Sequence, residues 1–294
     1  MLAAAIPHRQ TLERTVEHIR RAAKSVRVRT NRAQRRQLAT TIPRRPELAH
    51  LIDEQTGYAK LPFGTIKEVA PAIELAQRLM HDRRAMKKTE DEDLVLLSQP
   101  ECYEEAPIFF ELALSNDVLQ IATDYLGEVP IMMRIKLWWT PINSNLKGSQ
   151  LYHRDGQNWL KRQAKFLFVM NDVDETCGPF TFMPADVSLR VATALGSVHD
   201  QERVTDESMF QYANPADAIS LVGPPGTGAV VDSSRCFHFG ARARGGERLM
   251  LLFNFMGSID APQRMGGMLR SEGFRQRFGN DPVRELVMPR TSKR

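Results

Sequence analysis

One short segment, SQLYHRDG at residues 149–156, carries the clearest metal-ligand pattern in the chain. In a strand, side chains two positions apart point to the same face. If the segment is a strand, His153 and Asp155 present an imidazole nitrogen and a carboxylate oxygen to one point. An HxD pattern alone also occurs as a surface pair, so this pattern predicts a metal site only together with a third ligand.

The segment GAVVDSSRCFHFG supplies that third candidate, His238, on what reads as another strand. Two imidazoles and one carboxylate on one face of an octahedron form the facial triad of non-haem Fe(II) oxygenases, which leaves positions open for a bidentate co-substrate and O2. Cys236 would share the face of His238, so a thiolate ligand stays open beside the commoner role of a small buried hydrophobe. The remaining histidines lie in predicted helices or loops outside the strand series: His8, His18, His50, His81 and His199.

A co-substrate such as 2-oxoglutarate would chelate iron through its keto oxygen and one carboxylate, so a cation must hold its distal carboxylate. Arginine is best suited, because its planar guanidinium matches a carboxylate bidentately. Arg248 opens the apolar segment RLMLLFNF, where a buried charge needs a partner. Arg242 and Arg244 lie in the loop-like stretch GARARGG. We therefore predict Arg248 as the anchor and the other two as solvated loop residues.

Short apolar or alternating runs from Val129 onwards must position these residues. Gly, Pro, Asn and Asp separate the runs, which is typical of a β-sandwich or barrel. A polar, partly helical insertion over residues 185–215 interrupts the series. The runs are PIMMRIKLWWT, SQLYHRD, QAKFLFVMNDV, PFTFMP, AISLV, GAVVDSSRCFHF and RLMLLFNF. Phe166, Phe168, Phe180 and Phe182 alternate along them as core residues, some of which could wall a pocket.

Helices are predicted mainly before this series. Ser115 could cap the last turns of the helix at 106–126, and Gly127 stands where a glycine ends a helix. The segment GYAKLPFG reads as a strand. The other predicted helices are a basic helix or helix pair at 10–38 and a helix at 65–88. We expect a basic, mostly helical N-terminal extension (1–100) on the core, the core itself (101–256) and an irregular, polar C-terminal tail (257–294).

Composition is that of one sizeable core, since 42% of the 294 residues are hydrophobic. No apolar run reaches the roughly 18 residues of a transmembrane helix, and the first residues do not read as a secretory signal. Three cysteines without a CxxC pair suit a reducing cytoplasm, where we expect the protein.

Residues 1–46 hold 12 Lys and Arg against 2 Glu. This segment reads as a solvated helix face, although contact with nucleic acid, an anionic membrane or a phosphorylated substrate, or a transit-peptide role, stays open.

From about residue 103 to 256 the chain resembles the phytanoyl-CoA dioxygenase-like family of Fe(II)/2-oxoglutarate oxygenases. The resemblance is carried by LWWTP, SQLYHRDG, FLFVMNDVDETCGPFTFMPADVS and the block from His238 to Arg248. It implies a mainly β fold with flanking helices and a double-stranded β-helix (jelly-roll, cupin-like) core. It also implies His153, Asp155 and His238 as iron ligands and Arg248 as the carboxylate anchor. The stretch MPADVS departs from the family's usual turn.

The resemblance further implies a polar residue that touches 2-oxoglutarate on the strand before the first His. That strand offers Lys136, with Arg134 and Trp138 on the same face. Family halogenases replace the ligand carboxylate by a small residue, so the intact Asp155 favours oxygen insertion. The resemblance thus predicts an oxygenase that uses Fe(II), 2-oxoglutarate and O2, hydroxylates a small organic substrate and releases succinate and CO2.

Two alternatives stay open. A metal-binding barrel protein or hydrolase could hold zinc at the same three residues, but that hypothesis leaves Arg248 without a role. A non-catalytic module could bind nucleic acid through the basic N-terminus, but that hypothesis leaves the triad without a role. A small-molecule substrate is therefore the partner that the sequence favours over nucleic acid.

Overall fold

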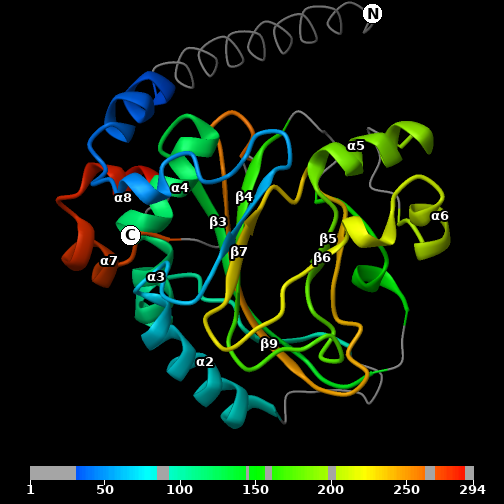
Figure 1. The fold of residues 1–294 in the computed structure, drawn as a ribbon. Coiled ribbons are helices and arrows are strands. Elements are labelled where there is room, and N and C mark those ends of the chain that lie inside the picture. Colours follow the sequence, from blue (N-terminus) through cyan, green and yellow to red (C-terminus); the bar gives the residue numbers. More distant parts are fainter. Residues whose placement is uncertain are drawn as a thin grey trace, which may run out of the picture.

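A computed structural model describes residues 31–84, 93–143, 146–155, 161–197, 203–261 and 269–288. Two antiparallel sheets lie at its centre (Figure 1). The larger sheet has the order β1-β7-β4-β9-β3-β2 and the smaller one the order β6-β5-β8. The strands are β1 (Tyr58–Leu61), β2 (Val95–Ser98), β3 (Ile131–Thr140), β4 (Gln163–Val169), β5 (Thr181–Phe182), β6 (Ile219–Ser220), β7 (Gly228–Val231), β8 (His238–Phe239) and β9 (Arg248–Met256).

Both faces of the larger sheet are covered, which is why its strands read as nearly continuous apolar runs. Side chains alternate between the faces along each strand. On β4, Phe166 and Phe168 belong to the core on the helical side, whereas Leu167 belongs to the core on the side of the smaller sheet. Phe180 and Phe182 lie in that second core, so all four alternating Phe residues are core residues, as predicted.

One layer of helices covers the outer face of the larger sheet, and the smaller sheet lies on the other side (Figure 1). The covering helices are α2 (Val69–Arg83), α3 (Pro107–Ala113), α4 (Asn116–Leu126), α7 (Glu272–Phe278) and α8 (Pro282–Val287). The predicted strand at GYAKLPFG and the helix within 65–88 are confirmed as β1 and α2. Short 3-10 turns are η1 (Pro46–Leu48), η3 (Tyr103–Glu105), η4 (Gly148–Gln150) and η5 (Pro215–Asp217).

The predicted helix at 106–126 consists of two helices that meet at Leu114 and Ser115. The Ser115 side chain accepts a hydrogen bond from the Val118 backbone N–H, so this residue caps α4 as predicted. Gly127 ends α4 with a left-handed backbone conformation at φ 72°. Glycine adopts this conformation without the steric cost that a Cβ brings. Both signals are confirmed.

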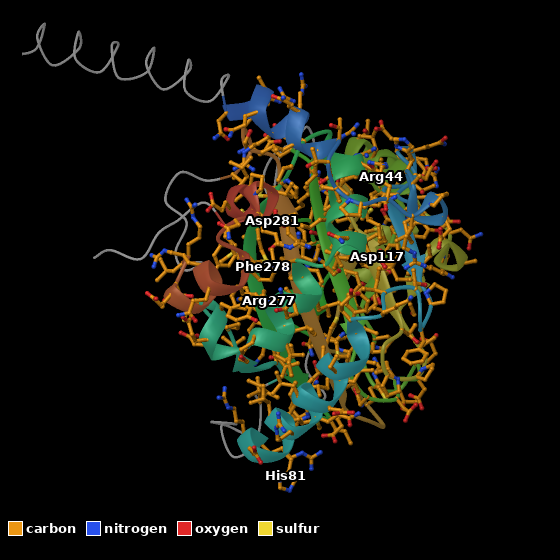
Figure 2. The ribbon with its side chains drawn as sticks, turned by 90° about the vertical axis from the view of Figure 1, so that its left-hand side faces the viewer. Arg44, His81, Asp117, Arg277, Phe278 and Asp281 are labelled. Atoms are coloured by element: carbon orange, nitrogen blue, oxygen red, sulfur yellow. The ribbon has the colours of Figure 1, made fainter. Side chains whose placement is uncertain are left out.

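The expectation of an irregular C-terminal tail is wrong for residues 269–288. Helices α7 and α8 begin with the side-chain caps Ser271 and Asp281, and they bury apolar side chains in the main core: Phe274, Phe278, Val283 and Val287. Figure 2 shows Arg277, Phe278 and Asp281 close together on the helical side of the molecule. Arg277 also forms an ion pair with Glu111 of α3, at 2.7 Å.

On the opposite side, α5 (Ala185–Ala194) and α6 (Asp206–Phe210) form the predicted helical insertion. Of the predicted basic helix at 10–38, residues 10–30 lie outside the described part of the chain, and residues 31–38 are helical. Within the described ranges, no helix has the length and apolar character needed to cross a membrane.

Candidate metal centre and its cleft

Three side chains that could bind one metal ion lie together between the two sheets. The ligand atoms of His153, Asp155 and His238 all lie within 4.8 Å of one another. The Nε2 atom of His238 is 3.8 Å from Oδ2 of Asp155, and the two imidazole rings are 4.4 Å apart between centroids. The structure therefore brings together the three residues that the sequence singled out.

Backbone pairing, not a regular strand, sets this geometry. SQLYHRD does not form the predicted strand, because it begins with the turn η4 and then makes only isolated bridges. The backbone N–H groups of His153 and His238 donate to each other's carbonyl oxygens, at 2.9 and 2.8 Å. The Asp155 N–H donates to the Ser233 carbonyl at 2.7 Å. These bonds place the three candidate ligands on neighbouring backbone segments, so that their side chains lie close together.

The predicted single strand GAVVDSSRCFHF is likewise two strands, β7 and β8, with a turn between them. The buried Asp232 carboxylate organises this turn, because it accepts hydrogen bonds from the Ser234 N–H at 3.1 Å and from the Tyr125 hydroxyl at 2.6 Å. The turn directs Cys236 away from the metal centre: its Sγ lies 3.7 Å from the carbonyl oxygen of Thr56. Cys236 belongs to the second core, and burial raises its pKa, so a thiolate ligand is not favoured.

Both imidazoles are oriented for metal binding. Nδ1 of His153 lies 2.9 Å from the Leu151 carbonyl oxygen, and Nδ1 of His238 lies 2.9 Å from that of Cys236. A carbonyl only accepts, so each Nδ1 carries the proton and each Nε2 keeps its lone pair for a metal. Burial lowers the pKa of His153 to about 4, and burial and the neighbouring His153 lower the pKa of His238 well below its usual range. Both rings are therefore neutral at pH 7, the form that binds metal.

The sequence reasoning missed Lys165, whose ammonium group forms an ion pair with the Asp155 carboxylate. Although burial opposes ionisation, the Lys165 ammonium group beside the carboxylate holds the pKa of Asp155 well below its usual range. The Gln163 side-chain amide also donates to the Asp155 carbonyl at 2.9 Å. A signal for Lys165 was present, because it is a single charge in the apolar run QAKFLFV. Arg248 likewise stands at the start of an apolar run.

A cleft of about 940 Å³ opens beside these residues and includes all three candidate ligands. Its floor is the inner face of β3, β4 and β9, where Lys136, Leu252 and Leu167 form one row across the three strands. Phe180 is part of the wall, with its ring 5.2 Å from that of His238. The volume falls in the range of small-molecule sites.

Arg248 lies at the buried end of this cleft, with 3% of its surface exposed. Its Nη2 donates to the Thr140 hydroxyl at 3.0 Å, whereas Nε and Nη1 are buried and have no hydrogen-bond partner within the described structure. Burial lowers its pKa to about 9, so the guanidinium is still charged at pH 7. Gly240 leaves room for the guanidinium, since a Cβ at that position would lie 3.0 Å from Nη1. Unpartnered buried donors on a cation suit a carboxylate ligand.

Lys136 and the two loop arginines differ in their surroundings. Lys136 lines the cleft, with its ammonium 4.9 Å from the centre of the Trp138 ring, and burial lowers its pKa. Arg244 is exposed, as predicted. The expectation of a solvated Arg242 is wrong, because its Nη1 and Nη2 donate to Asp206 of the insertion at 2.7 and 2.8 Å. Its guanidinium also covers the Phe239 ring, 3.5 Å from the centroid.

No model of a known protein family matches this chain, and no curated protein matches it in sequence. Solved structures do resemble it. EctD from S. alaskensis with 2-oxoglutarate and 5-hydroxyectoine is 17% identical with a TM-score of 0.55, and the match covers 86% of each chain. EctD with bound Fe is 18% identical, with a TM-score of 0.54 and the same coverage.

HygX from Streptomyces hygroscopicus with nickel and 2-oxoglutarate is 14% identical with a TM-score of 0.51, and the match covers 77% of this chain and 95% of that one. At these identities the likeness shows the fold. It confirms the predicted fold class, a mainly β protein with flanking helices and a double-stranded β-helix core.

Proposed function

We propose that this protein is an Fe(II)- and 2-oxoglutarate-dependent oxygenase of the phytanoyl-CoA dioxygenase-like type, which hydroxylates a small organic substrate. One observation carries the proposal: a His–Asp–His group and a buried arginine with two unpartnered N–H donors face the same cleft. The shared fold supports it, because EctD and HygX were solved with iron or nickel and with 2-oxoglutarate.

Each residue has a distinct part in this proposal. His153 and His238 offer neutral Nε2 atoms and Asp155 offers a carboxylate oxygen, a donor set that suits Fe(II). Arg248 holds the distal carboxylate of 2-oxoglutarate through its free N–H groups, and Lys136 contacts the same molecule from β3. With O2, bound iron and 2-oxoglutarate supply the oxidising chemistry, in which 2-oxoglutarate becomes succinate and CO2.

Zinc would also accept two imidazoles and a carboxylate. A zinc hydrolase, however, gives Arg248 no partner, and a buried cation with unsatisfied donors is costly unless a ligand pairs with it. The burial of Arg248 and its two unpartnered donors therefore favour a dicarboxylate co-substrate over a hydrolytic site.

The test is an anaerobic titration of the full-length protein with Fe(II) and then 2-oxoglutarate. Chelation of iron by the keto acid should produce a weak visible charge-transfer band, which His238→Ala should abolish and Zn(II) should not produce. A screen of small molecules for stimulated succinate release then tests catalysis. Folded, iron-loaded protein that shows no band with 2-oxoglutarate would refute the proposed function.

A further inference from the structure

The cleft carries more positive charge than the metal and co-substrate sites use. Five cationic side chains line it against two carboxylates, Asp155 and Asp260, counted over the described residues. A divalent metal and the 2-oxoglutarate dianion cancel each other, so they leave this surplus unchanged. The cations are Arg134, Lys136, Lys161, Lys165 and Arg248. Lys165 already pairs with Asp155, and Lys136 and Arg248 belong to the proposed co-substrate site.

The strand register separates the remaining cations from the co-substrate anchor. Arg248 lies beside Thr140 at one end of β9, and Asn254 lies between Arg134 and Lys165 near the other end. Six residues of a strand span about 20 Å, which is much longer than 2-oxoglutarate. Since Lys165 contacts Asp155, this polar row lies at the metal end of the cleft. Arg134 lies two strands from Lys165 in this row, so 2-oxoglutarate bound between Arg248 and the metal centre leaves this arginine free.

This outer row differs chemically from the floor between it and Arg248. Between that row and Arg248, the β9 residues that face the cleft are Met250 and Leu252, with Lys136 beside Leu252, whereas the outer row holds an amide between two cations. The Asn254 amide nitrogen donates to the Gln163 side chain at 3.2 Å, and its Oδ1 is buried without a partner in the described structure. Arg134 is exposed at the mouth, and no described carboxylate forms an ion pair with it.

Lys161 is also exposed, lines the cleft two residues before β4 and lies close enough to Asp260 to interact with its charge. We propose that Arg134 and Lys161 bind the acidic group of the substrate, a carboxylate or a phosphate ester, while its apolar body lies over Leu252. That this anion is the substrate rests on the proposed oxygenase function, but the anion subsite itself does not. Arg134 is the main specificity residue, because its planar guanidinium can hold either acid with paired hydrogen bonds.

The test is isothermal titration of the full-length, metal-free protein with octanoate, octyl phosphate and the neutral octanol at low salt. At least one anion should bind about 10-fold more tightly than octanol, because the cations of the cleft pair with its charge and octanol has no charge. Arg134→Gln should remove that advantage and leave octanol binding unchanged, and Arg134→Lys should restore part of it. Arg244→Gln, which removes an exposed arginine outside the cleft, should change nothing.

Three results would overturn the anion subsite. One is equal affinity for octanol and both anions, and another is no binding of either anion at millimolar concentration. The third is anion affinity that survives Arg134→Gln but disappears in Arg248→Met, which would place the anion on the co-substrate anchor. The charge-transfer band separates this hypothesis from the proposed function. Anion selectivity that depends on Arg134, in a protein without the band, would support the subsite and refute the oxygenase.

Discussion

The proposed role of Arg248 can be tested without turnover, by replacing Arg248 with Met. Methionine fills much of the same space but has no charge and no donors. If the guanidinium pairs with the distal carboxylate, its removal leaves that carboxylate without a partner in a buried site. Truncating one member of such a pair costs about 2–5 kcal/mol, so the Kd for 2-oxoglutarate should rise roughly 30-fold to a few thousand-fold.

The same substitution should have the opposite effect on the ligand-free protein. Arg248 is buried with Nε and Nη1 unpartnered, so the folded chain carries an uncompensated desolvation cost. Removing a buried unsatisfied group recovers about 1–3 kcal/mol, less the lost bond to Thr140. Arg248→Met should therefore unfold at an equal or higher urea concentration than the unsubstituted protein. If Arg248 served only in packing, its replacement would not combine greater stability with weaker ligand binding.

The assay is calorimetric titration of 2-oxoglutarate into Ni(II)-loaded protein, with urea unfolding of the metal-free form. Ni(II) affinity should barely change, because Arg248 is not in the group of candidate ligands. Arg244→Ala is the matched control, since Arg244 is exposed. Arg242 is unsuitable because it is paired with Asp206. Unchanged 2-oxoglutarate affinity in Arg248→Met, or a loss of several kcal/mol in stability, would show that the assignment of the anchor is wrong.

Three further predictions concern the metal ligands. His153→Ala and His238→Ala should each weaken Ni(II) binding by more than roughly 10–100-fold, which is the cost of losing only a hydrogen bond that supports a ligand. The circular dichroism spectrum of each variant should be unchanged. Asp155→Gly should retain some metal but not hydroxylate, and full turnover in either His variant would exclude these ligands. Burial lowers the pKa of His153 from 6.5 to about 4. Between these two pH values the unfolded chain binds one more proton than the folded chain, so the free energy of unfolding falls as the pH falls. The metal-free protein should lose about 2 kcal/mol through His153 between pH 7 and pH 5, a loss that urea unfolding should find absent in His153→Gln.

The metal centre could be predicted because its residue types are rare in the chain and its spacing is short. His153 and Asp155 are two residues apart, and few other histidines compete for the role of third ligand. The predicted regular strands at both ligand segments are nevertheless wrong. The structure instead holds His153 and His238 by one isolated backbone bridge, and Asp155 by a bond to Ser233. Residues two apart still face the same point, because this extended backbone alternates without being part of a long strand.

The residues that were missed or wrongly predicted have one feature in common: their partners are distant in sequence. Arg242 looked solvated because nothing in GARARGG predicts that Asp206 of the insertion lies beside it. The C-terminal helices looked polar because their few apolar residues are spaced for one buried face, and short helices give a weak periodic signal.

The arrangement of the cleft follows from the alternation along a single strand. Arg248, Met250, Leu252 and Asn254 of β9 all face the cleft, so the order of residues along β9 is also the order of chemical environments. Along β9 this order runs from the buried Arg248, past the apolar side chains, to the Asn254 amide beside Arg134 at the open mouth. A co-substrate can enter such a cleft first and reach the closed end, where Arg248 is inaccessible to bulk solvent. A substrate held at the mouth would then cover it, so the register of one strand favours ordered binding with the co-substrate first.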